Sequence, residues 1–139
     1  MITAERYHDI SCGHRVVGHE GKCRFLHGHN YRIHFEIQAE SLDTVGRVID
    51  FSVIKEKLCM WLEEHYDHKF LIWQEDPLLK DLQKIADESL VIVPYNPTAE
   101  NIAKYLVEVI GPQQLKDTAC RLIRCKVEET QKCSATYTI

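Results

Sequence analysis

The stretch CRFLHGHNY, residues 23–31, places one thiol and two imidazoles within a short span of chain. Cys23 precedes His27 by four positions, and His27 and His29 flank Gly28. Side chains two residues apart on a strand project to the same face, so the two histidines would point together. Because neutral imidazole is the commonest metal ligand in proteins, this triplet indicates a metal site. The alternative is a hairpin corner, in which the glycine makes the turn and the histidines are half exposed.

A third ligand would be needed, because a catalytic zinc ion commonly takes three protein ligands and keeps a fourth position open. His14, which we expect on the turn after the first strand, is the natural choice, and His19 is its competitor. Cys23 has three interpretations. The first is a base or nucleophile that metal-bound histidines or the cation Lys22 activate. The second is a fourth ligand that closes a structural site, and the third is a small loop residue. Spacing alone leaves all three open.

Two further groups could take part in acid–base or binding chemistry. In the pair Asp67-His68 a carboxylate can orient an imidazole and raise its basicity, although the dipole of a preceding helix also favours a histidine there. The run Glu128-Glu129-Thr130 stands at the end of a predicted strand, where acids are mostly solvated. Held in a pocket, such a carboxylate would instead bind a guanidine-like edge through two hydrogen bonds.

The composition is that of a globular chain of 139 residues, and we expect one domain over residues 1–139. The net charge of −4, from 17 basic and 21 acidic residues without long blocks of either sign, argues against a nucleic-acid partner. No apolar run is long enough to cross a bilayer, and the N-terminus lacks a signal-peptide pattern. Cys59 and Cys125 fit helical and strand patterns as small buried hydrophobes. We therefore expect a cytoplasmic protein with reduced thiols and no membrane partner.

Hydrophobic periodicity predicts the strands that would hold these side chains. Residues 30–40 alternate as in a half-buried strand, with an apolar face made by Tyr31, Ile33, Phe35, Ile37 and Ala39. A first strand is expected near residues 2–10, and a hairpin return is expected through Val48 and Ile49. A short strand is a candidate at residues 90–93, and the final hairpin is expected within residues 121–130 and 133–139.

Two helices are expected between these strands. Asp50 can cap the first, which should end near Tyr66 and carries an apolar stripe of Ile54, Leu58, Trp61, Leu62 and His65. Thr98 can cap the second, which Gly111-Pro112 should end. A short helix is a further candidate within residues 76–89. The order of two strands, two helices and two strands predicts an α+β fold with helices on one face of an antiparallel sheet.

Taken in order, these motifs resemble the 6-pyruvoyltetrahydropterin synthase family, and within it the bacterial branch that forms 6-carboxy-5,6,7,8-tetrahydropterin. The resemblance covers nearly the whole chain. It rests on five blocks, CGHRV (12–16), CRFLHGHNY (23–31), VIDFSVIK (48–55), YDHKFL (66–71) and NPTAENIA (96–103), followed by Glu129-Thr130. The stretch from Trp73 to Tyr95 looks longer than in the shortest family members, which bears on the rim of the pocket and on fine substrate preference.

The resemblance implies a role for each candidate residue. The positions that match the family's zinc ligands are His14, His27 and His29. Cys23 matches the catalytic cysteine, and Asp67 and His68 match the aspartate–histidine pair that works with it. Glu129 matches the glutamate that anchors the pterin, and Thr98 matches a position that contacts the pterin.

The resemblance also implies a reaction. Three residues separate Cys23 from His27, as in the carboxy-forming enzymes of queuosine and 7-deazaguanine synthesis, whereas the animal-type pyruvoyl-forming enzymes have a longer gap. We therefore expect a lyase that uses Zn²⁺ and converts 7,8-dihydroneopterin triphosphate to 6-carboxy-5,6,7,8-tetrahydropterin, with release of acetaldehyde and triphosphate. The alternatives are a 6-pyruvoyltetrahydropterin synthase, which eliminates triphosphate, and a non-catalytic zinc or pterin binder.

The fold implied by the resemblance is the tunnelling fold (T-fold), a four-stranded antiparallel sheet with two helices on one face. Subunits of the family join their sheets into a barrel by oligomerisation, usually as a homohexamer that is a dimer of trimers. The family places each active site at a subunit interface, so a site residue of one chain can serve the pocket of its neighbour.

Overall fold

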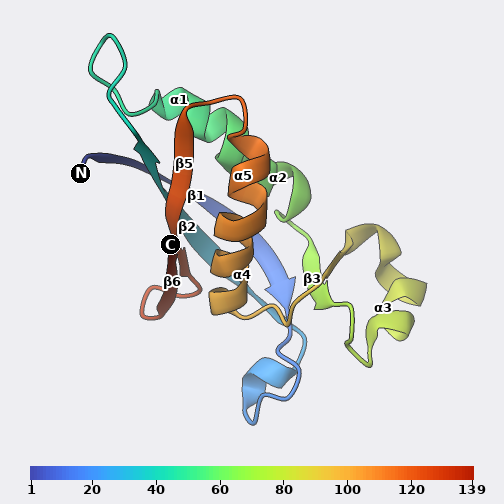
Figure 1. Cartoon of the computed structure of the whole chain (residues 1–139). Coiled ribbons are helices and arrows are strands. Elements are labelled where there is room, and N and C mark those ends of the chain that lie inside the picture. Colours follow the sequence, from blue (N-terminus) through green and yellow to red (C-terminus); the bar gives the residue numbers. More distant parts are fainter.

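Six strands form one curled sheet in the computed structural model, which describes residues 1–139 (Figure 1). The strand order is β4-β3-β1-β2-β5-β6. At its centre β1 (Thr3–His14) pairs antiparallel with β2 (His27–Ala39), whose alternate residues face the core as the sequence predicts. β1 is longer than predicted, because it runs to His14. This histidine therefore ends a strand and does not lie on the following turn.

The predicted C-terminal hairpin is confirmed as β5 (Cys120–Glu128) and β6 (Ser134–Thr138), and β5 pairs antiparallel with β2. On the other side of β1 the sheet gains two short parallel strands, β3 (Phe70–Trp73) and β4 (Leu90–Val93). The four antiparallel strands are thus present within a mixed sheet of six. The sequence patterns do not predict β3, since four consecutive apolar residues carry no periodicity that distinguishes a strand from a helix.

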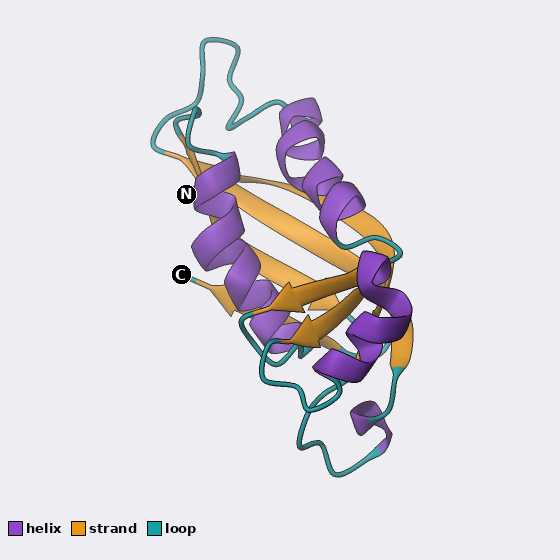
Figure 2. Cartoon of the chain, turned by 90° about the vertical axis from the view of Figure 1, so that its right-hand side faces the viewer, coloured by secondary structure: helices purple, strands orange, loops and turns teal.

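Two long helices cover one face of this sheet, as predicted (Figure 2). The first consists of α1 (Phe51–Ile54), a wider π-helical turn at Lys55–Cys59 and α2 (Met60–His65). The second consists of α4 (Ala99–Tyr105), a π-helical turn at Leu106–Ile110 and α5 (Gly111–Gln114). The predicted N-caps are both present, because Asp50 accepts from the Ser52 amide and Thr98 accepts from the Asn101 amide.

The prediction that Gly111-Pro112 ends the second helix is wrong. Gly111 follows directly on the π-helical turn, and Pro112 is the second residue of the last helical segment, where its missing N–H is tolerated. Gly111 lets this segment approach β5 closely, since a Cβ atom there would lie 2.9 Å from side-chain atoms of Leu122. The glycine therefore serves the packing of the helix on the sheet and not the end of the helix.

The predicted strand through Val48 and Ile49 is also absent. Residues 40–50 form a loop, in which the Asp43 carboxylate accepts from the backbone amides of Val45 and Arg47. Asp43 also pairs with the Arg47 guanidinium, at 2.8 Å. Side-chain hydrogen bonds of this kind give the backbone an alternative to a strand ladder.

A third helix, α3 (Leu79–Ala86), connects β3 to β4. Two neighbouring parallel strands require such a crossover. β3 pairs with β1 only at the C-terminal end of β1, where Gly13 lies opposite Phe70 and His14 lies opposite Leu71. The longer segment from Trp73 to Tyr95 therefore lies beside the end of β1 that carries His14.

The burial predicted for Cys59 and Cys125 is confirmed. None of the helices combines the length and the apolar character that crossing a bilayer requires. All six cysteines are free thiols, and Cys59 and Cys125 are fully buried. Burial raises the pKa of the Cys125 thiol, which therefore stays protonated and packs as a small apolar side chain.

Candidate active site

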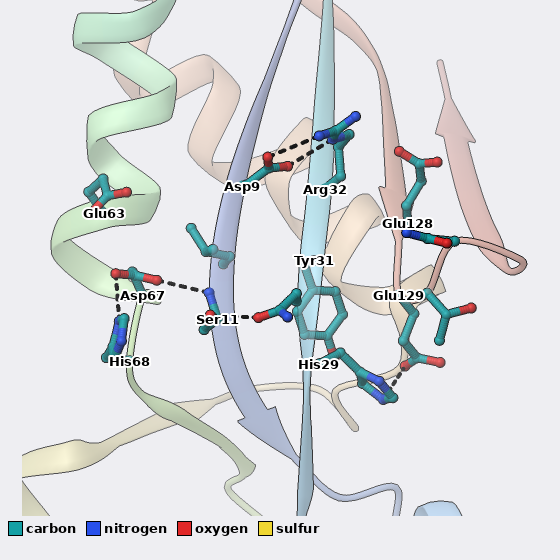
Figure 3. A pocket seen from close by; sticks show the side chains of 14 residues that line it. Asp9, Ser11, His29, Tyr31, Arg32, Glu63, Asp67, His68, Glu128 and Glu129 are labelled. Atoms are coloured by element: carbon teal, nitrogen blue, oxygen red, sulfur yellow. Dashed lines mark hydrogen bonds and ion pairs between the residues drawn. The ribbon is translucent and has the colours of Figure 1, made fainter.

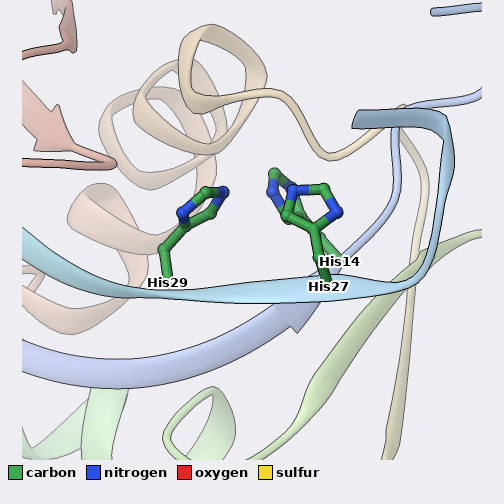
Figure 4. A group of neighbouring side chains, drawn as sticks. All are labelled: His14, His27 and His29. Atoms are coloured by element: carbon green, nitrogen blue, oxygen red, sulfur yellow. The ribbon is translucent and has the colours of Figure 1, made fainter. Parts of the chain in front are cut away.

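Three histidines meet at the end of the β1–β2 pair (Figure 4). The register sets His14 opposite His27 and Cys12 opposite His29, and alternation brings the three imidazoles to the same face. One ring nitrogen from each histidine lies within 4.8 Å of the other two. The structure thus brings together the three predicted ligands. His19 lies outside this cluster, and its Nδ1 accepts from the Gly21 amide.

The hydrogen bonds of these rings fit a divalent metal ion. His14 Nδ1 donates to the Pro97 carbonyl at 2.6 Å, and His27 Nδ1 donates to the Phe25 carbonyl at 2.7 Å. Because a carbonyl oxygen can only accept, the proton of each ring is on Nδ1 and the lone pair is on Nε2. The Nε2 atoms of all three histidines are buried and have no hydrogen-bond partner. Oriented imidazoles with free inward lone pairs are the donor set that zinc takes.

Burial disfavours the charged form of two of these imidazoles. It lowers the pKa of His14 to about 4, with a smaller opposing effect of the Pro97 carbonyl. Burial also lowers the pKa of His29, against the attraction of the nearby Glu129 carboxylate. Tyr31 lies beside the rings, and its hydroxyl is likewise buried without a partner. Four buried polar atoms that face no protein partner indicate that a polar ligand belongs at this place.

Replacing His27 by alanine is expected to abolish most of the metal binding, because two imidazoles hold zinc much more weakly than three. Wild-type protein incubated with a zinc salt and desalted should retain about one ion per chain. Metal content by mass spectrometry checks both statements. The matched control is His19→Ala, which should keep its zinc, and loss of zinc from this control would mean that the ligand set is wrong.

Glu129 borders the histidine cluster. Its Oε1 lies 3.4 Å from His14 Nε2 and 3.6 Å from His29 Nε2 (Figure 3). Alternation along β5 explains this direction, because Val127 faces the core and Glu129 follows it by two residues. Glu128 points the other way and its Oε2 lies 2.6 Å from His34 Nε2. Alternation that continues past the end of the strand places Glu128 and Glu129 on opposite faces, so the sequence pattern distinguishes the two glutamates.

Cys23 lies on a short 3₁₀ turn, Lys22–Arg24, in the loop between β1 and β2. Its carbonyl accepts from the Val16 amide at 2.8 Å, so the turn folds back on the residues that follow His14. The thiol is partly buried and does not belong to the ligand cluster. This arrangement does not support Cys23 as a fourth zinc ligand and leaves its thiol available for chemistry.

Asp67 and His68 form a hydrogen-bonded pair directly after α2. His68 Nδ1 donates to Asp67 Oδ2 at 2.7 Å, and the Ser11 amide donates to Asp67 Oδ1 at 2.9 Å. Partial burial pushes the pKa of Asp67 upward, but these two hydrogen bonds outweigh it and hold the pKa below the usual range. The carboxylate therefore stays charged and orients the imidazole.

The backbone holds His68 in an unusual conformation. It is the only residue other than glycine with a positive φ, at 59°, and its side chain is 80% exposed. A non-glycine residue in the left-handed region costs about 1–2 kcal/mol. The amide of His68 donates to the Ser11 carbonyl at 2.7 Å, which fixes this corner against β1. Strain held in place by neighbouring structure is typical of functional positions.

The Asp67–His68 pair and the Cys23 thiol do not line the same cavity. Asp67 and His68 lie beside β1, whereas His29 and Glu129 lie on the far side of β2 (Figure 3). All four residues border an open cavity of about 790 Å³ that extends across the two strands. Cys23 does not line this cavity. In one chain the pair, His29 and Glu129 therefore share a cavity, and the lining of that cavity lacks the predicted thiol.

Thr98 has a clear structural role. Its hydroxyl caps α4 by accepting from the Asn101 amide at 3.1 Å, and it does not line the cavity. The preceding residue, Pro97, supplies the carbonyl that orients His14. The expected contact between Thr98 and a pterin stays a prediction. No sequence signal indicated the carbonyls of Pro97 and Phe25, because any residue type can supply a carbonyl.

The family model of 6-pyruvoyl tetrahydropterin synthase matches residues 3–139, and the histidines, thiol and aspartate–histidine pair all fall within that match. This chain belongs to the 6-pyruvoyl tetrahydropterin synthase family. It is 37% identical over 134 residues to 6-carboxy-5,6,7,8-tetrahydropterin synthase of Rickettsia typhi. This aligned region covers 96% of this chain and 97% of the relative. A Haemophilus influenzae protein of the same name is 30% identical over 130 residues, which covers 88% of this chain and 92% of the relative.

Solved structures of other proteins share the fold. A protein of Wolinella succinogenes superposes with a TM-score of 0.84 at 24% identity and covers 99% of this chain and 97% of its own. Caenorhabditis elegans 6-pyruvoyl tetrahydropterin synthase superposes with a TM-score of 0.70 at 26% identity and covers 99% of this chain and 95% of its own. The predicted T-fold is therefore confirmed for the single chain, and its assembly into a barrel stays a prediction.

Proposed function

We propose that this family member is a zinc-dependent lyase that converts 7,8-dihydroneopterin triphosphate to 6-carboxy-5,6,7,8-tetrahydropterin, with release of acetaldehyde and triphosphate. The reaction would serve queuosine and 7-deazaguanine synthesis in the cytoplasm. The observation that carries the proposal is the set of three buried imidazoles with free inward Nε2 atoms. The names of the relatives that match nearly the whole chain support the choice of product.

His14, His27 and His29 would hold the zinc ion. When bound, zinc polarises the oxygens of a substrate side chain and acidifies the carbons attached to them. The site fits this use because protein supplies three nitrogens, which leaves a position open for substrate. The Pro97 and Phe25 carbonyls keep two of the rings in the tautomer that binds metal.

Cys23 and the Asp67–His68 pair would move the protons. The thiolate of Cys23 is a base that can remove a proton from the side chain of the pterin. His68 Nε2 is the free nitrogen of a ring whose Nδ1 is bonded to Asp67, so it can accept or return a proton while the carboxylate stabilises the imidazolium. The exposed position of His68 suits contact with a substrate held by another subunit.

Glu129 would bind the guanidine-like edge of the pterin. A carboxylate can accept two parallel hydrogen bonds from such an edge, which fixes the orientation of the ring. Glu129 is 24% exposed, and its Oε1 lies 3.4 Å from His14 Nε2 and 3.6 Å from His29 Nε2. With the Nε2 lone pairs committed to a metal, its oxygens would be free for the ligand. Thr98 would make a second contact, as the family resemblance implies.

We infer that the functional unit is an oligomer, proposed as a homohexamer built from two trimers. The position of Cys23 outside the cavity that the exposed Asp67–His68 pair lines supports this, because a neighbouring chain could supply the pair across an interface. The short edge strands β4 and β6 also leave backbone groups for pairing with other chains. Residues 1–139 would then act as one unit of this assembly.

Product analysis by mass spectrometry tests the proposal. Zinc-loaded protein given 7,8-dihydroneopterin triphosphate is expected to form carboxytetrahydropterin and acetaldehyde, and a zinc chelator should stop both. A pyruvoyl product would assign the chain a different reaction and a different pathway. We include this outcome because the chain is similar to the Caenorhabditis elegans 6-pyruvoyl tetrahydropterin synthase. Substrate that binds unchanged would refute the proposed lyase and make the chain a pterin binder.

A further inference from the structure

The turn that carries Cys23 is held by a side chain that follows a metal ligand. Arg15 comes directly after His14, and its NH1 donates to the Arg24 carbonyl at 3.1 Å. The Val16 amide donates to the Cys23 carbonyl at 2.8 Å. Two consecutive carbonyls, those of Cys23 and Arg24, are therefore bonded to two consecutive residues that extend β1. The position of the thiol depends on both contacts.

Arg15 is itself fixed by a buried carboxylate. Its Nε donates to Asp76 Oδ2 at 2.8 Å, and the Asp76 side chain is 0% exposed. The other oxygen of Asp76 accepts from the Leu78 amide at 2.8 Å. Burying a carboxylate is costly unless it is paired and hydrogen-bonded, and Arg15 is the cation that pairs with it. The planar guanidinium is thus held on one edge, so the NH1 on its other side is pre-oriented toward Arg24.

Asp76 belongs to the turn between β3 and α3, within the segment from Trp73 to Tyr95 that looks longer than in the shortest relatives. Just after this segment, the Asn96 side chain exchanges two hydrogen bonds with Val17, at 3.0 and 2.9 Å. The residues that follow β1 are therefore held at Arg15 and at Val17 from the two ends of the same segment. Neither contact involves a metal ligand.

We propose that Asp76 and Arg15 are positioning residues for Cys23, and that the segment from Trp73 to Tyr95 supplies Asp76, which holds Arg15 as a brace on the thiol-bearing turn. This inference rests on the proposed function for the importance of Cys23, but the contacts themselves do not. The brace fixes the turn from outside the cavity, so it sets the placement of the thiol without touching the substrate. A displacement of a reacting group by about 1 Å can cost up to roughly a hundredfold in rate.

The variant Asp76→Asn tests the brace. Asparagine keeps the size of the side chain but has only one oxygen. It therefore cannot accept from both the Leu78 amide and Arg15 Nε, as the two oxygens of Asp76 do. The matched control is Asp81→Asn, an exposed acid of the same segment in the first turn of α3. Three properties of the zinc-loaded full chain are measured. They are metal content, kcat and KM separately, and the rates at which iodoacetamide alkylates Cys23 and the exposed Cys133.

We expect Asp76→Asn to retain its zinc and its KM, while kcat falls by roughly tenfold or more. Release of the turn should raise the ratio of Cys23 to Cys133 alkylation by about threefold or more, because the thiol becomes more accessible. The control should leave kcat and the ratio unchanged. An unchanged ratio in Asp76→Asn, or the same change in the control, would overturn the proposal. Loss of zinc from Asp76→Asn would also overturn the proposal, because Arg15 would then support His14 and not Cys23.

A second variant decides the question if Asp76→Asn does not fold. Arg15→Lys keeps the charge beside Asp76, but a single ammonium group cannot reproduce both arms of the guanidinium. The alkylation ratio is expected to rise as for Asp76→Asn, and an unchanged ratio would overturn the proposal. Alkylation requires no turnover, so failure of the wild-type chain to form carboxytetrahydropterin would refute the proposed reaction and leave the test of the brace intact.

Discussion

A Cys23→Ala chain is expected to lose about three orders of magnitude in kcat while it keeps its zinc and binds the substrate. The physical reason is that the three Nε2 donors form a complete cluster to which the thiol does not belong. Removal of the sulfur therefore removes a proton-transferring group and no ligand. The measurement combines single-turnover kinetics on 7,8-dihydroneopterin triphosphate with metal analysis and calorimetric binding of the same substrate.

The matched control for this variant is Cys133→Ala, which removes an exposed thiol before β6 and should leave kcat unchanged. Full turnover by Cys23→Ala would refute the proposed role of the thiol. Loss of zinc along with turnover would mean that Cys23 closes the metal site as a fourth ligand. Retained binding and retained metal without turnover is the combination that only the catalytic interpretation predicts.

The parts of the fold that the sequence predicts are those with clear periodicity. The alternation after Asn30 gave the buried face of β2, and the caps at Asp50 and Thr98 gave the beginnings of both long helices. The errors lie where local signals compete with packing. Gly111 looks like a helix end, but its missing side chain lets α5 approach Leu122. β3 gives no signal of its own, because its pairing with the end of β1 is a contact distant in sequence.

The candidate site divides in the same way. The two-residue spacing of His27 and His29 predicts that they share a face, and this is observed. The approach of Glu129 to the cluster follows from continued alternation, so it could have been found. Arg15 and Asp76 could not have been paired from the sequence, since they are 61 residues apart and meet only because β3 pairs with the end of β1. Spacing also gave no indication that Cys23 would lie outside the cavity that Asp67 lines.

That separation leads to a second large effect. Co-expression of Cys23→Ala chains with His68→Ala chains is expected to restore activity that neither variant has alone. In the structure the Asp67–His68 pair lies beside β1 and lines a cavity that Cys23 does not line (Figure 3). If a neighbour supplies the pair, a mixed assembly contains some sites with an intact thiol from one chain and an intact His68 from the next.

The size of the recovery follows from random mixing. Each site needs one intact thiol and one intact pair from different chains, so an equal mixture should reach about one quarter of the wild-type rate. Two affinity tags select mixed assemblies, and kcat is then measured per chain. The control mixture of Asp67→Asn with His68→Ala should stay inactive, because these two side chains are bonded at 2.7 Å within one chain and act together. No recovery in verified mixed assemblies would mean that Cys23 reaches the pair of its own chain, which would require the turn braced by Arg15 to move.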